Sequence, residues 1–240
     1  MTAFLNYTWR LWFVMVALIA TIICGPFVYL FSFRAAWFRR SYFFMRLWCV
    51  IIFYGMGFRY KLHRGTDERL KPELQYILIS NHTSIMDIML MCILHPHHPI
   101  SFVGKKELEK IPVFGTVYRR VCVMVDRSSL RSRARVYKLC AQRMAAGQNI
   151  VIFPEGGVPD ETSVVLAPFK DGAFTLSAKH RFPIAVYTFR GLKEMFPFSL
   201  SKGYPGTVDV YLNAVLAPAA EEELKKEAYS LMLRSLGDEF

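Results

Sequence analysis

The sequence predicts an α/β protein, with a mixed β-sheet flanked by helices and preceded by an N-terminal membrane-associated helical segment. Three observations support this prediction. Residues 11–33 carry no charged side chain, the first acidic residue is Asp67, and from about Gly57 onward short β-branched runs alternate with helical patterns. We therefore expect residues 1–56 to form the membrane-associated segment and residues 57–240 to form the α/β domain.

The apolar leader is long enough to cross a bilayer. As a helix, Leu11 to Phe33 would extend roughly 35 Å, and the hydrocarbon core of a bilayer is about 30 Å thick. Gly25-Pro26 interrupts this run, however, and the second apolar run, Leu47–Phe58, is too short to cross alone. The leader is therefore expected to be either one span or a two-helix hairpin in one leaflet.

Eight basic residues and no acidic residue lie in the first 66 positions, so most of the net charge of +11 is N-terminal. A basic and apolar stretch of this kind suits an anionic membrane surface better than nucleic acid. No nucleic-acid partner is expected. Arginines follow the first apolar run at positions 34, 39, 40 and 46. By the positive-inside tendency, the rest of the chain should lie on the cytoplasmic face of the membrane.

Seven runs of strand length follow the leader. Strands are expected at Phe58–Leu62, Gln75–Ser80, Ile100–Gly104, Arg120–Asp126, Asn149–Phe153, Pro183–Phe189 and Thr207–Asn213. Helices are expected between and after them, at Thr83–Leu94, Ser129–Ala146, Gly172–Lys179 and Ala219–Leu236. In a sheet of this kind, functional side chains are expected where strands end and helices begin.

The segment Asn-His-Thr-Ser-Ile-Met-Asp, from Asn81 to Asp87, stands at such a place. The preceding strand would deliver His82 to the edge of the sheet, and Asp87 would lie about one helical turn further on. A carboxylate bonded to one imidazole nitrogen fixes the tautomer, so that the other nitrogen can take a proton from a substrate hydroxyl. Alternatively, Asn81 or Thr83 caps a helix and His82 is an ordinary loop histidine.

Other chemistries have weaker support in the sequence. There is no Gly-x-Ser-x-Gly motif, which disfavours a serine hydrolase. The five cysteines have no metal-type spacing and are expected to be unpaired core thiols. The His95-Pro-His-His98 run is expected to be an ordinary loop, because no carboxylate or cysteine lies alongside it. No metal ion and no cofactor are therefore predicted.

Four ordered blocks lie between Ile77 and Val186, and together they resemble the glycerolipid acyltransferase family. The blocks are Asn81–Asp87, Val125–Arg127, Phe-Pro-Glu-Gly at Phe153–Gly156, and Phe182–Ile184. A Lys-Lys-Glu-Leu run starting at Lys105 leads to Ile-Pro-Val-Phe-Gly between the first two. Within the family, the pattern is most similar to 1-acylglycerol-3-phosphate (lysophosphatidate) acyltransferases.

The resemblance implies transfer of an acyl chain from acyl-coenzyme A or acyl carrier protein to the hydroxyl of a lysophospholipid, forming phosphatidate. It implies that His82 is the base, Asp87 its orienting partner and Arg127 a phosphate contact. It also implies that Glu155 and Gly156 belong to the acceptor site. The alternatives are that Glu155 only forms a turn and that Arg127 is a solvated charge. Membrane lipids are the remaining expected partners.

The chain departs from the family pattern after Gly156. Where the family reads Phe-Pro-Glu-Gly-Thr-Arg-Ser, this chain continues Gly157-Val-Pro159 and lacks the arginine. Lys170, just before a predicted helix, is our candidate replacement for the missing cation.

Further candidate substrate contacts are Asn81, Gly157 and Lys105, although Lys105 could equally be a surface charge. The missing arginine also leaves open another acceptor, such as a monoacylated amino-acid lipid. A protein of a different class, a non-catalytic lipid-binding scaffold, is the other alternative.

Overall fold

The computed structural model describes residues 3–67, 69–111, 114–125, 130–159 and 163–237, with the backbone alone at residues 3 and 130–134. It divides into two compact units. The first unit comprises Met1–His63, His82–Pro96 and Phe189–Tyr211. The second unit comprises Arg64–Asn81, His97–Thr188 and Leu212–Phe240.

Seven strands form one mixed sheet in the order β1-β7-β6-β2-β5-β3-β4. They are β1 Arg59–Arg64, β2 Ile77–Ile79, β3 Ile100–Lys105, β4 Val123–Val125, β5 Asn149–Ile152, β6 Ile184–Arg190 and β7 Thr207–Leu216. Strand β2 pairs in parallel with β5 and β6, and β3 pairs in parallel with β4 and β5. All three residues of β2 are fully buried, as expected for an internal parallel strand. The predicted α/β fold with a mixed sheet is confirmed.

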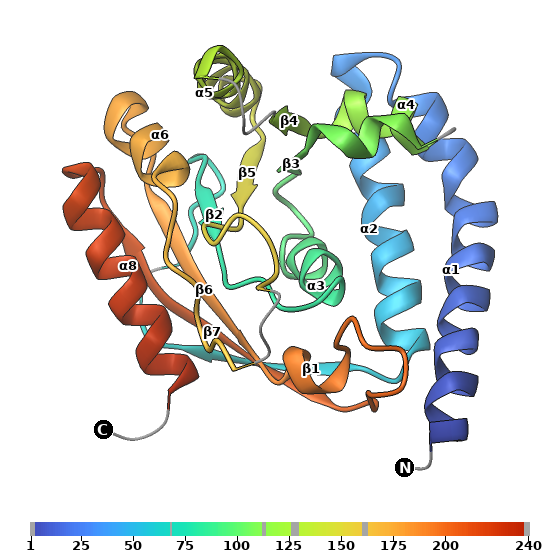
Figure 1. Cartoon of the computed structure of the whole chain (residues 1–240). Helices are drawn as coiled ribbons and strands as arrows, with labels where there is room; N and C mark the ends of the chain where they lie inside the picture. The colour runs from blue at the N-terminus through green and yellow to red at the C-terminus, as the bar shows by residue number, and fades with distance from the viewer. Residues whose placement is uncertain (1–2, 68, 112–113, 126–129, 160–162, 238–240) are drawn as a thin grey trace. The chain divides into compact units, whose positions relative to one another are not determined.

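Three helices of the second unit cover its part of the sheet: α5 Leu130–Ala145, α6 Gly172–His180 and α8 Glu221–Leu236. Figure 1 shows α6 beside α8, in agreement with their contacts. Cys140, Phe174 and Met232, one from each helix, share a buried core with Ile77 and Ile150 of the sheet. The helix predicted at Ala219–Leu236 is thus present as α8 and packs on this core.

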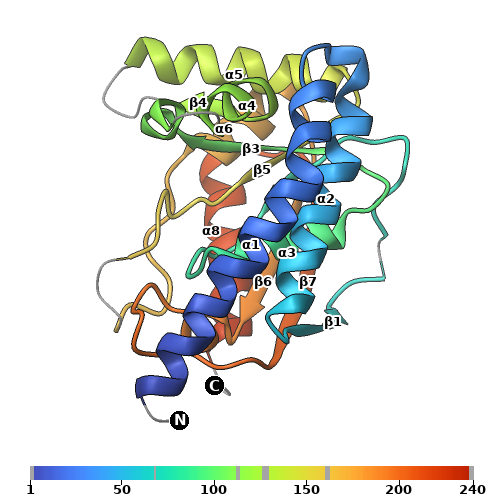
Figure 2. The same ribbon diagram turned by 90° about the vertical axis from the view of Figure 1, so that its right-hand side faces the viewer.

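In the first unit, α1 (Ala3–Phe31) and α2 (Phe38–Gly55) form a hairpin joined by a short 3-10 helix, η1 (Ala35–Trp37). Figure 2 shows the two helices side by side. Indole N–H groups join them at two levels: Trp12 donates to the Gly55 carbonyl at 2.9 Å, and Trp48 donates to the Thr21 hydroxyl at 2.9 Å.

The expected interruption at Gly25-Pro26 is wrong, because α1 continues through Pro26. A proline removes one backbone donor from a helix, and here packing against α2 supports the neighbouring turn. Phe27 stacks on Phe44 with ring centroids 4.5 Å apart, and the buried Ser41 hydroxyl donates to the Val28 carbonyl at 3.3 Å.

The side of α1 that faces neither α2 nor the rest of its unit is apolar. Its exposed residues include Phe4, Leu11, Leu18, Ile22 and Leu30. Among the described residues, α1 is the one helix long and apolar enough to cross a membrane. This composition is consistent with membrane association.

The remaining differences between prediction and structure are local. The predicted strand Arg120–Asp126 is shorter, because α4 (Phe114–Val121) takes its first residues and Asp126 lies outside the described residues. Four short elements were not predicted: α4, α7 (Leu192–Met195), η1, and the 3-10 helix η2 (Lys106–Lys110). The predicted helix Thr83–Leu94 begins only at Met86, as α3 (Met86–Leu94).

Candidate active site

The loop between β2 and α3 brings the motif residues to an edge of the sheet. Because β2 pairs in parallel with β5, and β5 with β3, the carboxyl ends of all three strands lie on the same edge. Asn81 stands two residues after the end of β2 and is 1% exposed. His82 follows directly in the chain.

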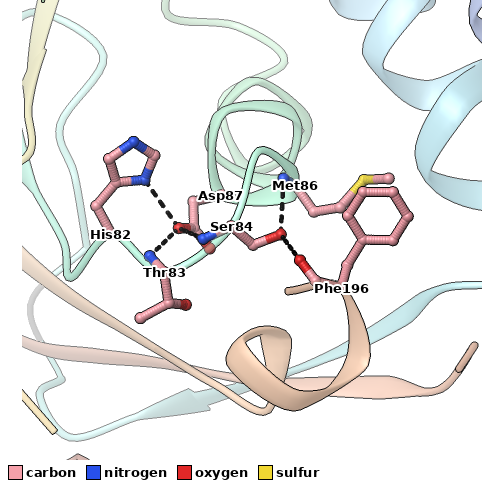
Figure 3. A network of polar contacts seen from close by, with 6 residues as sticks. All are labelled: His82, Thr83, Ser84, Met86, Asp87 and Phe196. Atoms are coloured by element: carbon pink, nitrogen blue, oxygen red, sulfur yellow. Dashed lines mark hydrogen bonds and ion pairs between the residues drawn. The ribbon is translucent and has the colours of Figure 1, made fainter. Parts of the chain in front are cut away.

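Asp87, the second residue of α3, is the centre of a hydrogen-bond network (Figure 3). Its oxygen Oδ2 accepts the backbone N–H groups of Thr83 at 2.6 Å and Ser84 at 2.8 Å. The same oxygen lies 3.0 Å from Nδ1 of His82. The Asp87 side chain is 0% exposed, so these bonds hold the carboxylate in one orientation.

This geometry fixes which nitrogen of His82 can act as a base. A carboxylate only accepts, so Nδ1 carries the proton and Nε2 of the neutral ring has a lone pair. Nε2 lies on the side of the ring away from Asp87 (Figure 3), and the side chain is 16% exposed. The arrangement can take a proton from a hydroxyl that reaches Nε2.

The alternative explanation of the motif as a helix cap does not fit α3. Ile85 occupies the N-cap position and its side chain makes no capping bond. Asn81 and Thr83 lie further upstream, because residues 83–85 form the turn that encloses the Asp87 carboxylate. This turn is why α3 starts three residues later than predicted.

Ser84 supports the network through a contact that we did not predict. Its hydroxyl donates to the Phe196 carbonyl at 2.7 Å and accepts the Met86 N–H at 3.2 Å. Phe196 follows α7 and is 112 residues away in the chain. No local pattern in the sequence signals such a pair. The hydroxyl thus holds the turn in place and is not aimed as a nucleophile.

The Phe-Pro-Glu-Gly block follows β5 in the second unit. The Gly156 N–H donates to the Phe153 carbonyl at 3.0 Å, and Gly156 has a φ of 81°, a value that favours glycine. Glu155 is 6% exposed, and its Oε2 accepts the Ala167 N–H at 2.9 Å. Glu155 therefore joins this turn to the segment before α6.

Lys170 lies over the same turn. Its backbone N–H donates to the Pro154 carbonyl at 2.8 Å, and a methyl group built on Gly156 would lie 2.7 Å from Lys170 Nζ. The next residue, Asp171, occupies the N-cap of α6, and its Oδ1 forms an ion pair with Nζ of Lys225 at 2.6 Å. The negative charge of the Asp171 carboxylate disfavours anion binding at the N-terminus of α6. The Lys170 ammonium is therefore the group in this region that is suited to bind an anion.

The other predicted substrate contacts are placed as follows. Lys105 is exposed at the end of β3, and its carbonyl accepts the Tyr118 hydroxyl at 3.2 Å. Gly157 is half-buried next to Gly156. Arg127 lies outside the described residues, as do Pro112 and Val113 of the Ile-Pro-Val-Phe-Gly run.

The five cysteines are thiols outside any disulfide, as expected, and four of them are buried. Burial raises the pKa of the Cys140 thiol to about 12. A hydrogen bond with Cys49, together with burial, raises the pKa of Cys92 well above its ordinary value. Both thiols therefore remain protonated at neutral pH and are poor nucleophiles.

Comparison with known proteins identifies the family. Residues 62–189 match the sequence pattern of the family described as Acyltransferase. The chain belongs to this family.

Two relatives of this chain differ in the acceptor that their names state. The chloroplastic 1-acyl-sn-glycerol-3-phosphate acyltransferase BAT2 of Brassica napus is 30% identical over 187 residues, which cover 76% of this chain and 51% of that protein. The lyso-ornithine lipid O-acyltransferase of Brucella abortus is 33% identical over 174 residues, which cover 70% of this chain and 59% of that protein.

The fold is also known from a solved structure. The 1-acyl-sn-glycerophosphate (LPA) acyltransferase PlsC from Thermotoga maritima superposes with a TM-score of 0.79 at 22% identity, over 98% of this chain and 96% of that one. The chain spans about half the length of the algal and plant relatives that it matches.

Proposed function

We propose that the protein transfers an acyl chain from acyl-coenzyme A or acyl carrier protein to the free sn-2 hydroxyl of 1-acylglycerol-3-phosphate, giving phosphatidate and free thiol. The observation that carries this proposal is the His82–Asp87 pair, in which two backbone N–H groups fix the carboxylate. The family provides the reaction type, and the names of several relatives support the acceptor.

The proposed reaction needs no covalent enzyme intermediate. Nε2 of His82 takes the hydroxyl proton as the oxygen attacks the thioester carbonyl, and Asp87 stabilises the imidazolium that forms. The tetrahedral intermediate collapses with cleavage of the carbon–sulfur bond. The leaving thiolate then takes the proton from His82, which regenerates the neutral base.

The acceptor carries a phosphate monoester, which requires fixed cations and N–H donors. We assign this role to Lys170, with Glu155, Gly156 and Gly157 forming the acceptor loop. The close approach of the Lys170 ammonium to Gly156 supports this assignment. Arg127 is proposed as a second phosphate contact.

We propose Asn81 as a further substrate contact at the end of β2, and Lys105 as a contact to the phosphates of the donor. Asn81 follows β2 and Lys105 is the last residue of β3, and the carboxyl ends of these strands lie at the same edge of the sheet. This placement supports a role in substrate binding.

We further propose that residues 1–56 associate with the membrane and that the α/β domain of residues 57–240 works on its cytoplasmic face. The apolar outer side of α1 supports membrane association. Arginines 34, 39, 40 and 46 after the first apolar run support the orientation. Such a placement gives both acyl chains an apolar environment while the thioester arrives from solution.

A second acceptor class, a lyso-ornithine lipid, has support of its own. The arginine of the usual Phe-Pro-Glu-Gly-Thr-Arg-Ser block is replaced by Val158 in this chain. The relative with 33% identity is named for that lipid. A monoacylated amino-acid lipid presents a carboxylate in place of a phosphate monoester, which one lysine could pair with.

The test is a transfer assay with purified protein in detergent micelles, using both donors against lysophosphatidate and lyso-ornithine lipid. Product is measured by mass spectrometry, and thiol release is measured separately. The proposal expects kcat/KM for lysophosphatidate to exceed the value for lyso-ornithine lipid by at least about tenfold, a difference of about 1.4 kcal/mol. The reverse preference would establish the second acceptor class instead.

A further inference from the structure

Arg10 is a charged residue buried in α1, the described helix that is long and apolar enough to cross a membrane. It is 8% exposed, although its neighbour Leu11 is 60% exposed. One turn earlier, Asn6 is also 8% exposed, and its Nδ2 donates to the Ser201 carbonyl at 2.6 Å. A buried charge is costly unless it is well hydrogen-bonded, so the partners of Arg10 indicate what it does.

The guanidinium of Arg10 binds the backbone of a distant loop. Its Nη2 lies 2.6 Å from the Pro197 carbonyl, 3.1 Å from that of Ser199 and 2.8 Å from that of Lys202. These carbonyls belong to the segment 196–203 between α7 and β7, which we call the 196–203 loop. One side chain of α1 therefore holds three points of this loop.

The 196–203 loop is also closed and pressed against α1. The Tyr204 N–H donates to the Met195 carbonyl at 2.9 Å, which ties the two ends of the loop together. Gly203 has a φ of 132°, and a methyl group there would lie 2.9 Å from the Trp9 ring. The loop thus approaches α1 too closely for any side chain at Gly203.

Phe196 opens this loop, and α1 encloses its ring. The Arg10 guanidinium carbon lies 3.8 Å from the ring centroid, a cation–π contact. The rings of Phe13 and Trp9 meet it edge-on, with centroid distances of 5.0 and 5.5 Å. Phe196 is 4% exposed. The same side chain that holds the loop therefore also fixes its first residue.

The Phe196 carbonyl accepts the Ser84 hydroxyl, and the Ser84 N–H donates to Oδ2 of Asp87 (Figure 3). A continuous series of contacts runs from α1 to the His82–Asp87 pair, and all of it lies within the first unit.

We propose that Arg10 is a positioning residue for acyl transfer. It fixes the Phe196 carbonyl, which fixes the turn around the Asp87 carboxylate and thereby the orientation of His82. This inference rests on the proposed role of His82 and Asp87. It gives α1 a part in the reaction that is separate from membrane association.

The kinetic test is a double-mutant cycle of Arg10→Gln and Ser84→Ala, measured in detergent micelles so that membrane binding does not limit the rate. Wild type is assayed first with the preferred acceptor, which tests the proposed function separately. In Arg10→Gln we expect kcat to fall on the order of 10- to 100-fold, because a small misplacement of reacting groups has effects of this size. Acceptor KM should change less than about threefold, because the substitution removes no interaction that binds the acceptor equally in the ground state and the transition state.

In the Ser84→Ala background the same Arg10→Gln change should lower kcat by less than about threefold, because the connection to Asp87 is already broken. Arg59→Gln is the matched control. Arg59 is exposed in the same unit, and its guanidinium donates to the carbonyl of the preceding residue and stacks on Tyr54. This variant should keep wild-type kcat. If Arg10→Gln has the same effect with and without the Ser84 hydroxyl, the proposal is wrong.

A second readout does not depend on activity. The Lys202 carbonyl belongs to a bond that trypsin can cut, and Arg10 holds that carbonyl. Arg10→Gln should accelerate cleavage after Lys202 at least about tenfold while Arg59→Gln does not. Arg10→Lys keeps a charged donor, so it should restore part of kcat and part of the resistance to cleavage after Lys202. The same variant replaces Arg10→Gln in both measurements if the glutamine variant folds poorly. Unchanged cleavage in Arg10→Gln would overturn the proposal.

Discussion

Asp87→Asn is the most direct test of the proposed base. The substitution keeps the shape of the side chain but removes its charge. Two backbone N–H groups point at the position of Oδ2, so the amide oxygen should occupy it and keep the bonds to Thr83, Ser84 and Nδ1 of His82. The change therefore isolates the stabilisation of the imidazolium by the carboxylate.

The expected loss has a lower and an upper bound. A charge-assisted hydrogen bond exceeds a neutral one by about 1–2 kcal/mol, which corresponds to roughly 5- to 30-fold in rate. Coulomb's law at the Nδ1–Oδ2 distance of 3.0 Å, with an effective dielectric constant of about 20, gives about 5.5 kcal/mol, or roughly 10⁴-fold. We expect kcat of Asp87→Asn to fall about 100-fold.

Steady-state kinetics with saturating donor distinguish this effect from misfolding. Both kcat and kcat/KM should fall together, because the imidazolium exists only after proton transfer begins. The melting temperature should change by less than about 4 °C, since the backbone bonds survive and about 1 kcal/mol shifts it by 2–4 °C in a chain of this size.

The chain offers a matched control in its second histidine–aspartate pair. Asp209 lies 2.6 Å from His63, and its side chain is 42% exposed. Asp209→Asn should leave kcat within about twofold of wild type, as expected for an exposed pair. Asp87→Asn with more than a third of wild-type kcat, or an equal loss in Asp209→Asn, would refute the assigned base.

Three further outcomes follow from the site. His82→Ala should abolish transfer, with kcat at least about 100-fold lower, while the circular dichroism spectrum stays native; wild-type turnover would contradict the mechanism. Lys170→Ala should raise acceptor KM about tenfold, whereas Lys179→Ala, the exposed control, should not; unchanged acceptor KM and kcat in Lys170→Ala would rule out the phosphate contact. In urea melts, Gly156→Ala should lower the free energy of unfolding by about 1 kcal/mol more than Gly147→Ala does. Both glycines have similar positive φ values, but of the two only Gly156 lies against another side chain, so equal losses would contradict this reasoning.

The parts of the fold that depend on neighbours in sequence could be predicted. The β2 strand and its fully buried residues follow from a short apolar run. The contact between His82 and Asp87 spans only five residues, so its geometry follows from a strand, a turn and a helix start. The Pro26 prediction was wrong because propensity favours a break, whereas α2 provides enough packing to continue the helix.

Contacts between distant residues could not be predicted. Ser84 gave no signal of its partner, because Phe196 is 112 residues away and the bond goes to a backbone carbonyl, which any residue has. Likewise, Arg10 could be counted only as one more basic residue of the leader. Lys170 stays a prediction, which follows from the arginine missing after Gly156 and from a lysine nearby in the chain, just before a helix.

The contacts of Arg10 also affect the order of events during synthesis. Its carbonyl partners lie 187 to 192 residues later in the chain. At translation rates of about 5–20 residues per second, the ribosome needs roughly 10–40 s to produce them. During that time α1 must keep its second turn hydrated, at the lipid–water boundary or in solution. Helix α1 therefore completes its packing long after it is synthesised. A nascent chain that stops before the 196–203 loop leaves the Arg10 guanidinium without the three carbonyls that accept from it.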